Sequence, residues 1–136
     1  MGEVAINWKA VLLATLVSFV LGALWYGPVF GKPWMRSLGI DPGVARQAPR
    51  IGLRRMLSIS FILEWIMAIC MAYFIGDKAD AMHGALYGLL TGLPWVASAI
   101  AVNSLYEQKS VAYIFITGGY WTVVFTLMGL ILGAWH

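Results

Sequence analysis

The chain has 136 residues, of which 61% are hydrophobic and only 11% are charged, and its mean hydropathy is +0.81. A soluble domain carries about a quarter charged residues, so this composition excludes an ordinary water-soluble fold and predicts an integral membrane protein. The net charge of +3 comes from few charges, and there is no basic domain large enough to bind nucleic acid. The single cysteine, Cys70, has no disulfide partner in the chain, and we interpret it as a packing thiol.

Four long apolar runs follow one another along the chain. A helix needs about 20 apolar residues to cross a bilayer, and the runs predict helices over residues of about 10–27, 56–76, 81–106 and 111–135. The first lacks a basic start and a cleavage site, so we expect a retained helix and not a signal peptide. Because the last two connections are very short, neighbouring helices must be antiparallel. We predict a single all-α transmembrane domain over residues 1–136, an up-down bundle of four helices.

Several residues are expected to shape the ends and the course of these helices. Gly27-Pro28 should end the first helix, and Asp80 should cap the start of the third. Pro94, near the middle of the third helix, removes a backbone hydrogen bond and should kink it. Asp41-Pro42 is typical of a helix start, which predicts a short interfacial helix inside the long loop.

The long loop over residues 28–55 is strongly basic. With the last short loop, this side of the bundle holds seven of the nine lysines and arginines: Lys32, Arg36, Arg46, Arg50, Arg54, Arg55 and Lys109. Only Lys9 and Lys78 fall on the other side. The positive-inside rule therefore predicts a cytoplasmic loop and both termini outside. The arginines at 46, 50, 54 and 55 could bind anionic lipid headgroups, or could simply set the topology.

Glu64 is the main candidate for a functional residue. It lies near the middle of the second predicted helix, where a charge costs at least a few kcal/mol. Its neighbours on the same helical face are small, so another helix can approach closely and Glu64 should face protein. One interpretation is a carboxylate that binds a proton or a cation. The alternative is a neutral side chain that hydrogen-bonds a tryptophan or tyrosine and holds the bundle together.

Aromatic residues also lie at mid-depth. The second, third and fourth predicted helices hold Trp65, Trp95 and Trp121 near their middles, and Tyr120 lies beside the last. Because indole usually prefers the membrane interface, their depth needs an explanation. They could line a cavity whose aromatic faces hold a cation near Glu64. Alternatively, they pack in the core with each indole N–H donating to an acceptor.

Small residues recur at every fourth position on several helix faces. The clearest sets are Ala10, Ala14, Ser18 and Gly22 in the first helix, Gly84, Gly88 and Gly92 in the third, and Gly129 and Gly133 in the fourth. Such patterns let helices pack closely in lipid. Since there are more of these faces than one bundle must bury, we expect a homo-oligomer.

Two further groups of polar residues are candidate functional sites. Asn103 and Glu107 lie four residues apart with Tyr106 beside them, which predicts a structural polar clamp or, alternatively, a gate. Two acids and a histidine near the start of the third helix are weak evidence for a metal site, since N-capping explains one of the acids. The chain has no nucleophile-base pair with an orienting group, no glycine-rich phosphate loop and no CxxC motif. We therefore expect no metal, no cofactor and no enzymatic activity.

The order of four motifs resembles a known family. INWKAVL opens the first helix, GALWYGPVFGKPWM follows its end, AVNSLYE closes the third, and GGYWTVVFTLMGLILGAW forms the last. Together they are similar to the small bacterial membrane proteins of the domain of unknown function 1761 family. The resemblance implies a four-helix protein of the bacterial cytoplasmic (inner) membrane. It implies no activity.

Two classes of function remain open from the sequence. One is a small oligomeric permease or channel for a proton or small cationic solute that uses Glu64, similar in plan to small multidrug transporters. The other is a membrane scaffold or accessory subunit, which would contact an unidentified membrane protein partner through its glycine faces and basic loop. A permease needs a Glu64 that water can reach, whereas a scaffold needs only its hydrogen bond.

Overall fold

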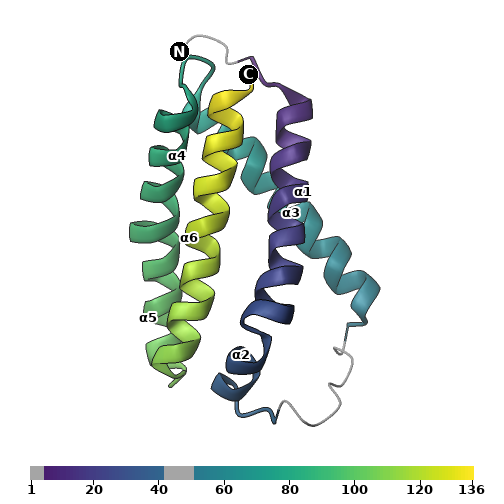
Figure 1. The fold of residues 1–136 in the computed structure, drawn as a ribbon, viewed down its shortest axis with the longest axis vertical. Coiled ribbons are helices and arrows are strands. Elements are labelled where there is room, and N and C mark those ends of the chain that lie inside the picture. Colours follow the sequence, from purple (N-terminus) through teal and green to yellow (C-terminus); the bar gives the residue numbers. More distant parts are fainter. Residues whose placement is uncertain (1–4, 42–50) are drawn as a thin grey trace.

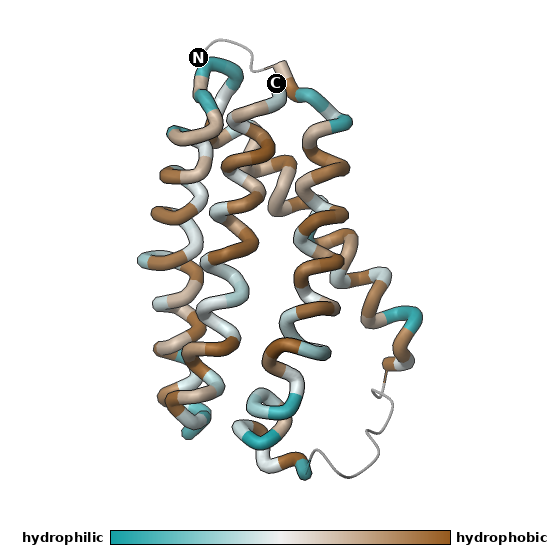
Figure 2. The backbone as a smooth tube through the Cα atoms, in the orientation of Figure 1, coloured by the Kyte–Doolittle hydropathy of each residue, from teal (hydrophilic) through white to brown (hydrophobic). Residues whose placement is uncertain are grey.

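The computed structural model describes residues 5–41 and 51–136, and everything regular in this part of the chain is helical. Four helices are long and apolar enough to cross a membrane: Trp8–Val29, Leu53–Ile75, Ala81–Tyr106 and Val111–Ala134. At about 1.5 Å per residue, even the shortest extends roughly 33 Å, slightly more than the thickness of a hydrocarbon core. Figure 2 shows that hydrophobic residues dominate these helices and that hydrophilic ones gather mainly at their ends and turns.

The sequence predicted that the first long helix ends at Gly27-Pro28, but the helix continues through the proline. Helix α1 (Trp8–Leu24) continues into a π-helical turn, Trp25–Val29, which contains the proline. The N–H of Phe30 donates to the carbonyl of Trp25, five residues earlier, at 2.8 Å. This wider turn accommodates a residue that has no N–H of its own.

The segment predicted as a loop over 28–55 is partly helical. Helix α2 (Gly31–Ser37) follows the π-helical turn directly, and α3 (Leu53–Ile75) begins three residues before the predicted start. Residue 42 and the eight that follow lie outside the described residues, as does the interfacial helix predicted to start at Asp41-Pro42. Helix α3 ends at Gly76, whose φ of 78° suits a residue without a side chain.

The third long helix has the predicted cap and a widened middle. The carboxylate of Asp80 accepts from the N–H of His83 at 2.8 Å, where α4 (Ala81–Leu90) begins. Pro94 lies in the π-helical segment Thr91–Ala97, which leads into α5 (Ser98–Tyr106). The helix thus accommodates Pro94, which cannot donate a backbone hydrogen bond, by a local change to π-helical geometry. The last helix, α6 (Val111–Ala134), is capped by the hydroxyl of Ser110.

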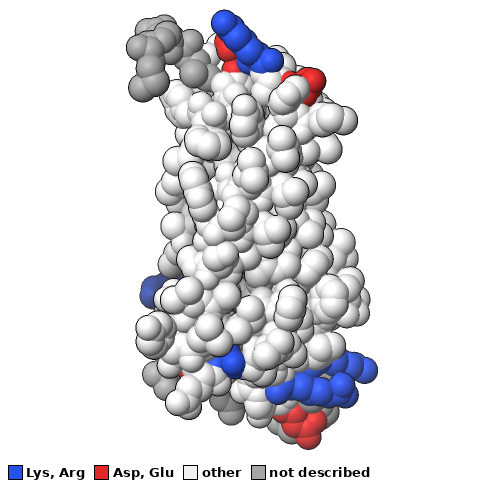
Figure 3. All heavy atoms as spheres, turned by 90° about the vertical axis from the view of Figure 1, so that its left-hand side faces the viewer, with Lys and Arg blue, Asp and Glu red and all other residues white. Residues whose placement is uncertain are grey.

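Figure 1 shows the start of α1 and the end of α6 at the same end of the molecule. Helices α4 and α5 follow one another along one long helix, and α6 lies beside it, whereas α3 crosses α1 obliquely. The four long helices are therefore not all near parallel. Figure 3 shows that the visible charged side chains gather mainly toward the two ends of the molecule. The exposed side chains along the four long helices include many large hydrophobic ones.

The predicted glycine faces of α4 and α6 pack against each other. A Cβ atom at Gly84 would collide with the carbonyl oxygen of Gly129, and one at Gly88 would collide with that of Phe125. A Cβ at Gly92 would lie 2.9 Å from the Cα of Thr122. Only glycine allows this approach of the two backbones.

A second core joins α1, α3 and α6. The predicted small-residue face of α1 is fully buried at Ala10 and Ala14, and that of α3 is fully buried at Ala68. From α6, Val124 and Met128 are also fully buried. Most residues of the small-residue faces that predicted a homo-oligomer are therefore buried inside the described chain.

Candidate binding cavity

Glu64 lies at the centre of α3 and is turned into the protein, where its side chain is only 5% exposed. Ala68 and Ala72, one and two helical turns further on, are buried on the same face. The small side chains let α1 and α6 approach this face of α3. As a result, a carboxyl group is enclosed at mid-length of the helices.

The hydroxyl of Tyr120 connects three helices around this carboxyl group. Its oxygen lies 2.9 Å from Oε1 of Glu64 on α3 and 3.0 Å from the backbone carbonyl oxygen of Ser18 on α1. A phenol has one hydrogen, so it donates to one of these acceptors at a time. No donor within the described residues reaches the second oxygen of Glu64, Oε2, although that atom is buried.

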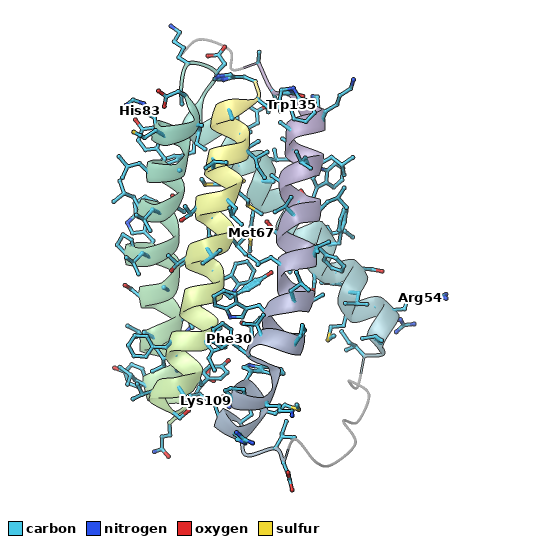
Figure 4. The ribbon with its side chains drawn as sticks, in the orientation of Figure 1. Phe30, Arg54, Met67, His83, Lys109 and Trp135 are labelled. Carbon is cyan, nitrogen blue, oxygen red and sulfur yellow. The ribbon has the colours of Figure 1, made fainter. Side chains whose placement is uncertain are left out.

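Glu64 lines a cavity of about 670 Å³ between α1, α2, α3 and α6. The lining is mostly apolar and aromatic, with a few hydroxyl groups and one carboxyl group. It consists of Phe19, Gly22, Ala23, Tyr26, Gly27, Trp34, Met56, Leu57, Ser60, Leu63, Glu64, Met67, Tyr113, Thr117, Tyr120 and Trp121. Figure 4 labels Met67, which lies among the side chains between α6 and α1.

Four aromatic rings form a continuous row along the cavity. The ring centres of Trp34 and Tyr26 are 5.0 Å apart, those of Tyr26 and Tyr120 are 5.3 Å apart and nearly parallel, and those of Tyr120 and Trp121 are 4.9 Å apart. Trp25 packs edge-on against Tyr120, and its indole N–H donates to the carbonyl of Ile116 at 2.9 Å. This hydrogen bond fixes the π-helical turn against α6 and holds the row in place.

Charged groups are scarce around the cavity. Of the lining residues, only Glu64 and three tyrosines are ionisable, and none is basic. At the end formed by α2 and the start of α6, Lys109 lies with its Nζ 5.6 Å from the ring centre of Tyr113. The carboxyl group therefore has no basic partner among the described residues that line the cavity.

The structure brings together only some of the predicted binding residues. Tyr120 and Trp121 line the cavity with Glu64, as expected for a cation site, but Trp65 and Trp95 do not. Trp65 follows the inward-facing Glu64 by one residue, about 100° around the helix, and is 42% exposed. Trp95 is 65% exposed and lies against Phe74, with ring centres 6.4 Å apart.

The residues predicted to form a polar clamp lie on the surface. Asn103 and Glu107 are exposed, and Tyr106 is 86% exposed. Within the described residues, the hydrogen bond between Asn103 and Glu107 is the ordinary backbone bond of the helix end. The clamp is therefore absent from this part of the fold, because its side chains point away from the other helices.

The predicted basic sites are only partly described. Arg54 and Arg55 are exposed at the start of α3, and Figure 4 shows Arg54 pointing away from the helices. Arg46 and Arg50 lie outside the described residues. This placement agrees with a contact to headgroups as well as with a role in topology alone.

Asp80, one of the two acids near the start of α4, caps that helix. Asp80 accepts from the backbone N–H of His83 and lies 2.7 Å from its ring Nδ1, and these contacts hold the pKa of the carboxyl group below its usual value. No group of three metal-binding side chains occurs within the described ranges.

Tyr26, Trp34 and Tyr113 also line the cavity and were not predicted from the sequence. A readable signal existed on α6, where Tyr113, Thr117 and Tyr120 recur with helical spacing and therefore share one face. No comparable signal was available for Tyr26 and Trp34, which are brought to the cavity by the π-helical turn and by the fold of α2.

Comparisons with known proteins identify a family without an assigned activity. The family model described as "Protein of unknown function (DUF1761)" matches residues 9–133, nearly the whole chain. The comparison with curated proteins and the comparison with solved structures give no match.

Proposed function

The chain belongs to the DUF1761 family, and we propose that it is a multi-pass protein of the bacterial inner membrane that moves a proton or a cationic solute past Glu64. The observation that carries this proposal is the buried carboxyl group with one free oxygen in a large cavity. A carboxylate in apolar surroundings is unfavourable unless a proton or a cation neutralises it. Binding such a species is therefore the chemistry that this site favours.

The proposed membrane orientation follows from charge. The four long helices would form an up-down bundle across the bilayer, with their apolar outer surface against lipid. In the sequence, seven of the nine lysines and arginines fall between the first and second long helices or between the third and fourth, and by the positive-inside rule this bias supports a cytoplasmic location of that side with both termini outside. The cavity would then extend from Glu64, at mid-depth, toward the cytoplasmic side.

Homo-oligomerisation remains a prediction, but its original basis has changed. The glycine faces of α4 and α6 are occupied by each other, so they do not favour a second copy. The proposed function therefore rests on the cavity of one chain. Mass-resolved chromatography in mild detergent measures whether the protein runs as one chain or several.

A scaffold or accessory subunit is the second candidate function. The observation in its favour is the hydroxyl of Tyr120, which joins α1, α3 and α6 through Ser18 and Glu64. In this case Glu64 would serve only as an acceptor within the fold. A solute-binding role, in contrast, requires the free oxygen and the cavity.

Uptake into vesicles distinguishes the two functions. We expect pH-dependent uptake of protons or of a cation from a panel of metal and organic cations by the reconstituted wild-type protein. Glu64→Gln keeps the shape and an acceptor for Tyr120 but cannot ionise, and it should abolish this uptake. Asp77→Asn, at an exposed carboxyl group outside the cavity, is the matched control and should transport normally. A wild-type protein without uptake, or a fully active Gln variant, would leave the scaffold function.

A further inference from the structure

We propose that the cavity at Glu64 binds an organic monocation with an aromatic or bulky apolar body, and that this cation takes the place of one proton on the carboxyl group. The inference rests on the proposed function and specifies its solute. It follows from four properties of the cavity: its volume, its charge, its aromatic wall and its opening.

The volume favours a molecule and not a bare ion. Cavities of about 300–1,000 Å³ are typical of sites for drug-sized ligands, and this one measures about 670 Å³. Hard divalent cations need six or more oxygen ligands at short distance. The lining offers one carboxyl group and scattered hydroxyls, so such an ion would lack most of its ligands.

The charge of the lining favours a single positive charge. Glu64 is the one carboxyl group among the lining residues, and its Oε2 accepts no hydrogen bond from the described residues. The other ionisable groups that face it are phenols, Tyr26 from the π-helical turn and Tyr120 and Tyr113 from α6; α1 and α2 contribute none to the lining. One bound cation would neutralise one carboxylate, whereas a dication would leave an unpaired charge.

The single carboxyl group of the lining also predicts that a bound cation exchanges with a proton. An empty, mostly apolar cavity favours the protonated carboxyl group, because none of the described residues that line it is basic. When a cation R⁺ binds, Glu64–COOH becomes the pair Glu64–COO⁻·R⁺, and one proton is released to solvent. No other reactant is needed.

The aromatic wall favours an apolar body around the charge. Tyr26 and Tyr120 lie nearly parallel, and Trp34 and Trp121 extend the row on either side. The faces of such rings attract cations, and the attraction is stronger where water is excluded. The wall and the carboxylate together complement a charge that is surrounded by aromatic or aliphatic groups.

The opening also favours a lipophilic ligand. Leu57 and Leu63 line the cavity and are 42% and 51% exposed, so the cavity reaches the apolar outer surface of α3. Lys109 near Tyr113 adds a positive charge at the polar end and would repel a hydrophilic cation there. A cation that partitions into lipid can reach the carboxylate through the apolar opening.

Direct binding to the purified full-length protein tests the inference. Tetraphenylphosphonium is the probe, tetraphenylborate is an anion of the same shape, and tetramethylammonium is a small cation without rings. With binding to protein-free micelles subtracted, we expect the phosphonium to bind at least about tenfold more tightly than either of the others. Equal or tighter binding of the borate would overturn the proposal, because the cavity would then select shape alone. Equal binding of tetramethylammonium would overturn the requirement for an aromatic or bulky apolar body, because aromatic faces attract a small quaternary cation as well.

Variants and proton release locate the bound cation. Glu64→Gln and Tyr26→Leu should each weaken phosphonium binding by about tenfold or more, and Asp77→Asn should leave it unchanged. In weakly buffered solution, binding at neutral pH should release about one proton per cation from the wild type and none from Glu64→Gln. Unchanged phosphonium binding by Glu64→Gln would overturn the proposal, because it would indicate an apolar groove that binds any lipophilic molecule. A wild-type protein that binds the cation without releasing a proton would contradict the exchange. The comparison of ligands on the wild-type protein stays decisive even where a variant fails to fold.

The inference and the proposed function fail in different ways. Uptake of small cations that depends on Glu64, without phosphonium binding, would overturn the solute class and keep the permease. Phosphonium binding at Glu64 without any uptake would keep the binding site and overturn the permease.

Discussion

At the scale of single residues, the hydroxyl of Tyr120 is the polar link between the core and the cavity. It lies within 3.0 Å of acceptors on both α1 and α3, and the residue itself is only 4% exposed. Replacing it by Phe keeps the ring but leaves the buried Glu64 without its donor. We expect Tyr120→Phe to lower the free energy of unfolding by about 1–2 kcal/mol. Thermal unfolding in detergent measures this loss, and Tyr106→Phe, at a tyrosine that is 86% exposed, should have no effect. Equal stability of the two variants would contradict the link.

At the scale of elements, the contact of α4 with α6 depends on glycine. Because a Cβ at Gly88 would overlap the backbone of α6, Gly88→Ala must push the two helices apart. We expect a loss of about 1–3 kcal/mol, typical of overpacking. Gly27→Ala is the control, since nothing lies within 4 Å of a Cβ at that position. The loss should appear as a lower unfolding temperature at constant molecular mass. A variant that instead changes only its oligomeric state would place this face between chains.

At the scale of the whole molecule, the proposed orientation is open to labelling. Asp77 and Glu107 are exposed at the two ends of the third long helix, and neither contributes to the lysine and arginine bias. In a background with Cys70 replaced by Ala, we expect Asp77→Cys to react with a membrane-impermeant reagent in intact cells. Glu107→Cys should react only after the membrane is opened, because its side is the basic one. The reverse labelling pattern would show that the proposed membrane orientation is inverted.

The sequence by itself determined the number and place of the long helices. Runs of about 20 apolar residues are a local property, as is the Asp80 cap. Glu64 could also be singled out, since its charge is anomalous within such a run. The family followed from motifs spread along the chain, and the match over residues 9–133 confirms it.

The tertiary structure decided which residues meet. Trp65, Trp95 and the residues around Asn103 have the same local signals as the true cavity residues, yet they face outward. Tyr26 and Trp34 line the cavity of Glu64 only because a π-helical turn carries the chain past Pro28 into α2. Within the described chain, the glycine faces of α4 and α6 pair with each other, because the packing of these two helices brings their backbones together. Hydropathy and helical period determine which residues form each helix. Where most residues are apolar, they do not determine which helix packs against each face. That choice depends on the close packing of small residues and on the few hydrogen bonds that buried polar side chains need.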